Sequence, residues 1–172
     1  MAEEKGMKEG KAKIEVETNM AEVRAVIGRP ETERLIKKGE HAAALLVTAV
    51  DLEFVLQKHL ERYRDANGGS VRNDDVKSVI NNLNECYVGT FKTTFDEIYS
   101  ENDCPEYSEM QKVEWDKYEP ELSQLIDIRN DIAHEKGAFT EIWRNAYEGL
   151  ENKSEVEDLI ETVYEFCDQN PY

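Results

Sequence analysis

The chain has 172 residues and a net charge of -17, with 40% apolar and 34% charged residues. This composition excludes collagen-like chains and disulfide scaffolds, and the negative charge argues against a general nucleic-acid coat protein. Three cysteines without a C-x-x-C spacing predict neither a zinc site nor a disulfide framework, so we expect a reducing cytoplasm. No segment has the run of about 20 apolar residues that a membrane helix requires.

The first part of the chain predicts an extension followed by a long helix. We expect residues 1–29 to be mobile or to form a short helix that ends at Gly28, and residues 30–172 to fold as one bundle. From Pro30, a good first-turn residue, apolar side chains follow a helical period over about 35 residues, up to the stop signal at 66–69. The members that recur at every seventh position are Leu35, Ala42, Ala49, Leu56 and Tyr63.

Two further long helices are predicted in the middle of the chain. One begins near Asn73, where the two following aspartates suit the positive end of a helix, and continues to Ile98. The other spans about 107–135, and Pro120 either starts a new helix or bends this one.

The last part of the chain predicts two more helices. A shorter one surrounds Trp143, and the last one opens at Ser154, which has the spacing of a capping box with Glu157. Together these patterns predict an all-α fold, a bundle of four or five helices.

The charge is unevenly distributed along the chain. Residues 73–172 hold 25 acidic and 8 basic side chains, whereas acids and bases are equal in number before residue 73. Local positive potential is therefore expected in the first part, where small basic groups include Lys37 and, on one predicted helix, Lys58, Arg62 and Arg64. These groups are either solvated helix surface or the contact for an anionic ligand.

One segment combines residue types that suit an anionic ligand. The sequence LIDIRNDIAHEKG places Arg129, Asn130, Asp131 and His134 within six positions at a predicted helix end. Arginine offers a permanent cationic fork that matches a phosphate, and histidine exchanges protons near neutral pH. Asparagine can form hydrogen bonds that orient either side chain.

The spacing of this segment leaves two interpretations open. On an ideal helix Arg129 and His134 lie about 140° and about 7.5 Å apart, so they would flank a phosphodiester. A frayed helix end, or a two-fold dimer with two such ends face to face, would bring them together. In the other interpretation these residues have only a structural role. His134 interacts favourably with the negative C-terminal end of the helix dipole, and Arg129 pairs with Asp127 or Asp131 at the surface.

The motif R-N-D-I-A-H resembles the R-x-x-x-x-H motif of HEPN domains, the higher eukaryotes and prokaryotes nucleotide-binding superfamily. A second similarity lies in residues 42–56, where small residues and a Leu-Glu-x-x-Leu pattern are similar to the first long HEPN helix. The resemblance covers roughly residues 31–168 in helix order. It implies a HEPN-like helical bundle that forms a homodimer.

The resemblance also implies an activity, the metal-independent cleavage of RNA, which leaves 2′,3′-cyclic phosphate ends. Arg129, Asn130 and His134 would be its catalytic residues, with Asp131 and Glu53 in supporting roles. His134 would help to deprotonate the ribose 2′-hydroxyl, and Arg129 would stabilise the charge on the phosphoryl oxygens. No cofactor and no metal are implied.

Such domains occur in toxin–antitoxin and other defence systems, so the expected partners are RNA or a nucleotide and a cognate antitoxin or nucleotidyltransferase. Lys136 stands where some toxin members have a tyrosine that a partner nucleotidyltransferase modifies, so that form of regulation is not implied. Binding of RNA to so acidic a chain would require a basic rim, made by Lys37, Lys58, Arg62 and Arg64.

Two other functions are compatible with the sequence. A non-catalytic HEPN-like module would have the same fold and dimer but would bind a nucleotide or a partner protein without cleavage. An all-α, magnesium-dependent nucleotide pyrophosphohydrolase would need rows of carboxylates on facing helices. One such row is present in the last helix, as Glu157, Glu161 and Glu165 with Asp158 adjacent.

Overall fold

The computed structural model describes residues 20–67, 73–100, 113–134 and 153–172, with no side-chain description at 20–27, 67, 100, 133–134 and 153. All regular structure in these ranges is helical, which confirms the predicted all-α bundle. The helices are α1 (Met20–Lys37), α2 (His41–Asn67), α3 (Asp74–Asn81), α4 (Val88–Ser100), α5 (Trp115–His134) and α7 (Lys153–Gln169), and a short 3-10 turn, η1, covers Leu83–Glu85.

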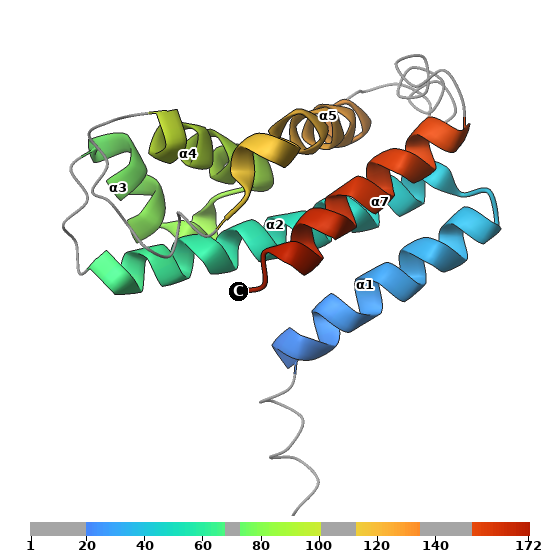
Figure 1. The fold of residues 1–172 in the computed structure, drawn as a ribbon, viewed down its shortest axis with the longest axis horizontal. Helices are drawn as coiled ribbons and strands as arrows, with labels where there is room; N and C mark the ends of the chain where they lie inside the picture. Colours follow the sequence, from blue (N-terminus) through green and yellow to red (C-terminus); the bar gives the residue numbers. More distant parts are fainter. Residues whose placement is uncertain (1–19, 68–72, 101–112, 135–152) are drawn as a thin grey trace, which may run out of the picture.

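Helix α2 is the centre of the bundle and contacts every other described helix (Figure 1). Helices α1 and α2 are antiparallel and form a helical hairpin. Helix α7 lies parallel to α2, since Tyr164 contacts Asp51 (2.7 Å) and Asn170 contacts His59 further along both helices (2.7 Å). Residues from the two ends of the sequence therefore pack against the same central helix.

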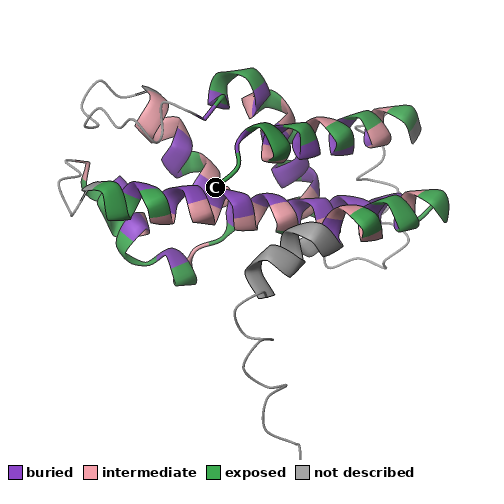
Figure 2. Ribbon diagram, turned by 60° about the horizontal axis from the view of Figure 1, so that its bottom comes forward, coloured by how far each residue is buried: buried purple, intermediate pink, exposed green. Residues whose placement is uncertain are grey.

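The core is formed by one face of each helix, because buried and exposed residues alternate at helical spacing (Figure 2). The predicted seven-residue repeat is confirmed as part of this core, with each of its five members at most 5% exposed. Aromatic side chains fill the space between α4, α5 and α7, where Phe95 stacks on Trp115 with ring centroids 4.8 Å apart. The largest fully buried side chains are Tyr63, Tyr118, Phe91, Phe95 and Phe166.

The single helix predicted from residue 30 to residue 66 is wrong, because the chain turns at Gly39. Gly39 has a φ of 77°, which glycine adopts without a Cβ clash. The amide of Glu40 donates to the carbonyl of Leu35 (2.9 Å), the six-to-one hydrogen bond of a glycine C-cap. The seven-residue repeat continues from Leu35 to Ala42 because both helices face the same core.

The helix end predicted at Gly28 is also wrong, because α1 continues through this residue. A methyl group at Gly28 would overlap the carboxylate of Asp51 on α2. Glycine is therefore required here for a close contact between two helices, whereas a helix end would use its backbone freedom. Pro30 lies in the same helix, where it removes one amide donor without ending the helix.

Of the two helix starts predicted from polar residues, the one near Asn73 is confirmed, and the structure adds an N-cap there. The side chain of Asn73 accepts hydrogen bonds from the amides of Asp75 (2.9 Å) and Val76 (3.1 Å), as an N-cap does. Helix α7 begins at Lys153, so the predicted cap residue Ser154 already lies inside the helix.

The continuous helix predicted over 73–98 is wrong, because it is divided into α3, η1 and α4. Asn82 ends α3 with non-helical angles (φ -124°, ψ 33°), and Cys86 is extended (φ -103°, ψ 158°). Asparagine is a poor residue for a helix interior, and three asparagines stand at 81, 82 and 84. As a result Tyr87, which lies between η1 and α4, is 67% exposed.

Several predictions concern residues outside the described ranges. They are the start of the extension at residues 1–19, the first residues of the helix predicted over 107–135, and the short helix around Trp143. Helix α5 contains Pro120 in its second turn and continues through it. The predicted division of the chain into 1–29 and 30–172 remains a prediction, and α1 extends across that boundary.

Candidate functional site

Arg129 and Asn130 are neighbours near the C-terminal end of α5, and both side chains are half-buried. Nη1 of Arg129 donates a 3.1 Å hydrogen bond to Oδ1 of Asn130. Two of the three residues predicted to be catalytic are therefore held against each other by a direct contact.

The buried face of α5 fixes the position of this pair. Leu125 and Ile126 are buried immediately before it, and a methyl group at Gly89 of α4 would lie 3.9 Å from Cγ2 of Ile126. The first turn of α4 thus lies against α5 at Ile126. Asn130 is one helical turn further along the same face, so it emerges from α5 just beyond the start of α4.

The charge of Arg129 has no carboxylate partner among the described residues. Asp127 and Asp131, the partners expected in the structural interpretation, are both exposed and do not pair with it. By contrast, Arg29 and Arg64 each contact a carboxylate, at 2.5 Å and 3.1 Å. Arg129 therefore differs from these arginines in having an amide, and no carboxylate, as its described partner.

The remaining motif residue, His134, is the last residue of α5. Its side chain lies outside the description of the structure, so its approach to Arg129 remains a prediction. Asp131 is exposed on α5, next to Asn130. Both residues are placed by the backbone at the same end of the bundle as the Arg129–Asn130 pair.

Glu53, the predicted supporting acid, contacts the start of α4. Its Oε2 accepts a 3.2 Å hydrogen bond from the amide of Val88, the first residue of α4. A carboxylate in this position is favourable because it faces the positive end of the helix. The described role of Glu53 is thus to fix the first turn of α4, which in turn lies against α5.

The predicted basic rim is not gathered around Arg129. Tyr118 in the first turn of α5 contacts Glu165 near the end of α7 (2.9 Å), and His59 also lies at that end. Arg129 is about 16 Å further along α5, toward the opposite end of the bundle. The three cations of α2, which are Lys58, Arg62 and Arg64, therefore lie away from Arg129. Lys37, the last residue of α1, lies at the end of the bundle where α7 begins.

The cations of α2 are also engaged locally. Lys58 pairs with Glu61 (2.6 Å), and Arg64 with Asp65 (3.1 Å). Arg62 donates to the carbonyl of Pro171 (3.5 Å). These contacts reduce the positive potential that the group could offer to RNA.

The carboxylate row of α7 links helices. Glu157 contacts His41 of α2 (3.4 Å), Glu161 pairs with Arg29 of α1 (2.8 Å), and Glu165 contacts Lys117 of α5 (3.5 Å). The described residues contain no group of three or more His, Cys, Asp or Glu side chains arranged to hold a metal ion. The row is therefore directed toward three different helices, and nothing in the described part favours a pyrophosphohydrolase.

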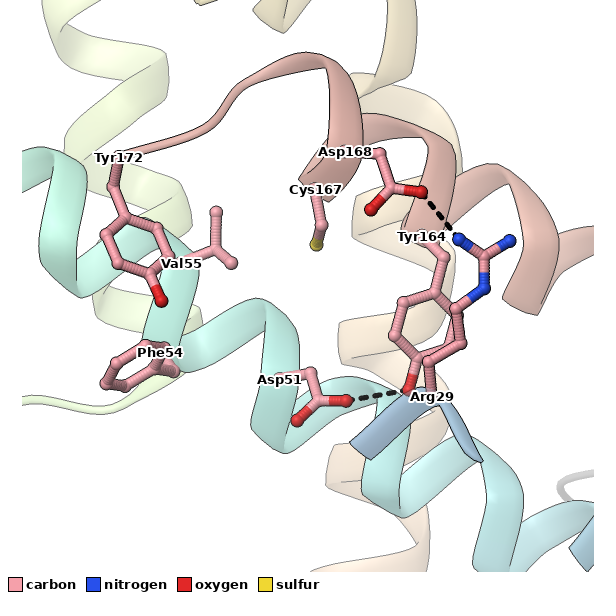
Figure 3. A pocket seen from close by; sticks show the side chains of 8 residues that line it. All are labelled: Arg29, Asp51, Phe54, Val55, Tyr164, Cys167, Asp168 and Tyr172. Carbon is pink, nitrogen blue, oxygen red and sulfur yellow. Dashed lines mark hydrogen bonds and ion pairs between the residues drawn. The ribbon is translucent and has the colours of Figure 1, made fainter. Parts of the chain in front are cut away.

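A second candidate site, absent from the sequence predictions, is a cavity between α1, α2 and α7 (Figure 3). Its polar centre is the hydroxyl of Tyr164, which donates to Oδ2 of Asp51 (2.7 Å) and accepts from Thr32 (2.9 Å). Above it, Arg29 pairs with Asp168 (2.5 Å). The contacts join three helices around a buried tyrosine.

Burial perturbs the ionisable groups of this cavity. It raises the pKa of Asp51, and the hydrogen bond from Tyr164 offsets part of that effect. It also raises the pKa of Tyr164 well above the ordinary value. Burial, together with the negative charge of Asp51 and Asp168, raises the pKa of Cys167 to about 12, so this thiol is no thiolate nucleophile at neutral pH.

A sequence signal for this cavity exists, but it is incomplete. Asp51 is an acidic residue within the largely apolar stretch 42–56, and a carboxylate that is buried there needs a hydrogen-bond partner. The partner, Tyr164, is 113 residues away and could be found only from the packing of α7 on α2.

Compared with protein-family models, with curated proteins and with solved structures, the chain finds no match. Across the described residues, no helix is both long enough and apolar enough to cross a membrane. The functional interpretation therefore depends on the two sites themselves.

Proposed function

We propose that the chain is a HEPN-like, metal-independent endoribonuclease of the cytoplasm, with Arg129, Asn130 and His134 as its catalytic residues. One observation carries this proposal: a half-buried guanidinium that is held by an amide and has no carboxylate partner in the described part of the chain. A partly desolvated charge without a counter-charge is unfavourable, and an RNA phosphate would supply the missing anion through the same fork geometry.

In the proposed reaction His134 takes the proton from a ribose 2′-hydroxyl, and the 2′-oxygen attacks the adjacent phosphorus. Arg129 stabilises the negative charge that develops on the phosphoryl oxygens, while Asn130 keeps the guanidinium in place. The bond from phosphorus to the 5′-oxygen breaks, and a protonated His134 donates to that oxygen. The products are a 2′,3′-cyclic phosphate and a 5′-hydroxyl, and no metal takes part.

A homodimer supports this chemistry. One histidine acts as the base while the other acts as the acid, and a two-fold axis near the end of α5 would place two copies of the motif in one cleft. A cognate antitoxin is the proposed partner, since covering this end of the bundle would block the site.

The first test is cleavage of single-stranded RNA by the full chain in excess EDTA. Cleavage with cyclic phosphate ends is expected, and DNA of the same sequence should stay intact because it lacks the attacking hydroxyl. His134→Ala and Arg129→Ala should each reduce the rate by about a hundredfold or more. Arg129→Lys should also be impaired, because a lysine keeps the charge but loses the fork.

Arg34→Ala is the matched control, since it removes an exposed arginine of α1 that pairs with Glu31 and should leave the rate close to that of the unchanged chain. Circular dichroism of each variant separates lost chemistry from lost folding. If folded His134→Ala cut RNA at an undiminished rate, the proposed catalytic role would be wrong.

The second candidate is a non-catalytic nucleotide-binding module with the same Arg129 contact. The positions of Lys58, Arg62 and Arg64 favour it, because a site without a basic rim suits one phosphate group better than a polyanion. Binding of a mononucleotide that depends on Arg129, with no cut RNA ends, would select this function.

A further inference from the structure

The cavity between α1, α2 and α7 is formed by none of the residues proposed for RNA cleavage. It has a volume of about 100 Å³, several times the space that one water molecule needs. Its floor contains the buried side chains Val55 and Tyr164, and its mouth contains the exposed residues Asp168 and Tyr172. The cavity is thus a recess with an apolar floor that a small molecule could enter from the surface.

The carboxylate of Asp51 has no positive partner among the described residues. Its Oδ2 accepts from the Tyr164 hydroxyl, and Figure 3 shows its other oxygen on the side of Phe54. Arg29, which also lines the cavity, is already engaged by Asp168 and Glu161 (2.8 Å). Burial raises the pKa of Asp51, which is the mark of a carboxylate that lacks compensation.

The walls of the cavity are aromatic. Phe54 and Tyr172 meet edge to face, with ring centroids 5.4 Å apart and planes at 86°. The rings here already attract cations of the protein itself: the Arg29 guanidinium lies 5.4 Å from the Tyr164 centroid, and Lys58 Nζ lies 5.6 Å from that of Phe54. Aromatic faces beside an uncompensated carboxylate are the combination that recognises organic cations.

We propose that this cavity binds a small alkylammonium ion, whose N–H groups donate to Oδ1 of Asp51 and whose carbon atoms pack on Phe54 and Tyr172. An anion would meet the carboxylates of Asp51 and Asp168. A neutral apolar molecule would leave the Asp51 charge uncompensated. A metal ion would need several oxygen, nitrogen or sulfur ligands, and no such group of ligands is found in the described part of the chain.

The test is an NMR titration of the isotope-labelled full chain with isopropylammonium chloride. Saturable shifts are expected for the amides of Phe54, Cys167 and Tyr172. Propan-2-ol, which has the same carbon skeleton without the charge, should cause none. Asp51→Asn keeps the size of the side chain and an acceptor for Tyr164, and it should weaken binding by about ten- to a hundredfold. Phe54→Leu removes one ring and should weaken binding by about two- to thirtyfold.

Asp65→Asn is the matched control, because it removes an exposed carboxylate from the end of the same helix and should leave binding unchanged. Sodium chloride at equal concentration should give no saturable shifts at these amides. Equal binding by Asp51→Asn, equal binding of propan-2-ol, or shifts that follow ionic strength alone would each overturn the proposal. If Asp51→Asn failed to fold, unchanged binding by Phe54→Leu would overturn it. None of these outcomes depends on RNA cleavage.

Discussion

The hydroxyl of Tyr164 on α7 donates a 2.7 Å hydrogen bond to Asp51 on α2, and the same oxygen accepts from Thr32 on α1 at 2.9 Å. A tyrosine hydroxyl has one proton, so the bond to Asp51 determines that Thr32 is the donor in the second contact. One buried side chain thus links α1, α2 and α7, the helices that surround the cavity of Figure 3.

Removal of this hydroxyl should destabilise the fold. Tyr164→Phe leaves the Asp51 carboxylate and the Thr32 hydroxyl without their shared partner, and we expect a loss of about 1–3 kcal/mol in the free energy of unfolding, measured by urea denaturation. Tyr87→Phe is the control, because the Tyr87 side chain is 67% exposed and its hydroxyl should contribute less than about 0.5 kcal/mol. Equal effects of the two substitutions would contradict the structural role of Tyr164.

The stability contribution of Asp51 should depend on pH with a defined sign. Burial raises its folded-state pKa above the ordinary 3.8, so the folded chain binds this proton more readily than the unfolded chain. The associated stability is fully present below about 3.8 and is lost as the pH rises through the raised pKa. Asp51→Asn does not titrate, so its stability relative to the unchanged chain should increase between acidic and neutral pH.

Urea denaturation of both chains over this pH range measures the difference, and Asp65→Asn provides a comparison with an exposed aspartate. A constant difference between Asp51→Asn and the unchanged chain at all pH values would refute the raised pKa.

The two helical glycines that contact other helices should respond to alanine in opposite ways. At Gly28 the added methyl group overlaps the Asp51 carboxylate, and we expect a loss of about 1–3 kcal/mol despite the better helix propensity of alanine. At Gly89 the nearest atom is Cγ2 of Ile126 at 3.9 Å, an ordinary contact, so Gly89→Ala should leave stability unchanged or raise it by up to about 1 kcal/mol. Thermal denaturation of both variants checks the contrast, which would fail if Gly28→Ala were neutral.

Glu53 should act through the first turn of α4. Glu53→Ala removes the acceptor of the Val88 amide and should cost about 1 kcal/mol, as the loss of a helix cap does. Glu53→Gln keeps an acceptor oxygen and loses the charge, so it should cost about 0.3–1 kcal/mol. Hydrogen exchange of the Val88 amide would locate the effect; exchange that is unchanged in Glu53→Ala would exclude the cap.

The sequence by itself determined the elements whose cause is local. The seven-residue repeat from Leu35 to Tyr63 predicted the buried face of the central helices, since helical periodicity is a property of consecutive residues. The aspartates after Asn73 predicted the helix start there, because acidic side chains suit the positive end of a helix. The Arg129–Asn130 pair was also visible, because the two residues are adjacent in the chain.

Only the tertiary structure decided which residues meet across helices. The repeat hid the turn at Gly39, because a hairpin that folds back on the same core continues the apolar pattern. Local rules predict a helix end at Gly28, whereas the structure shows that a glycine is needed there because the Asp51 carboxylate of another helix lies so close. The meeting of Asp51 with Tyr164 depends on how α7 packs against α2, and no local rule of spacing connects residues so far apart.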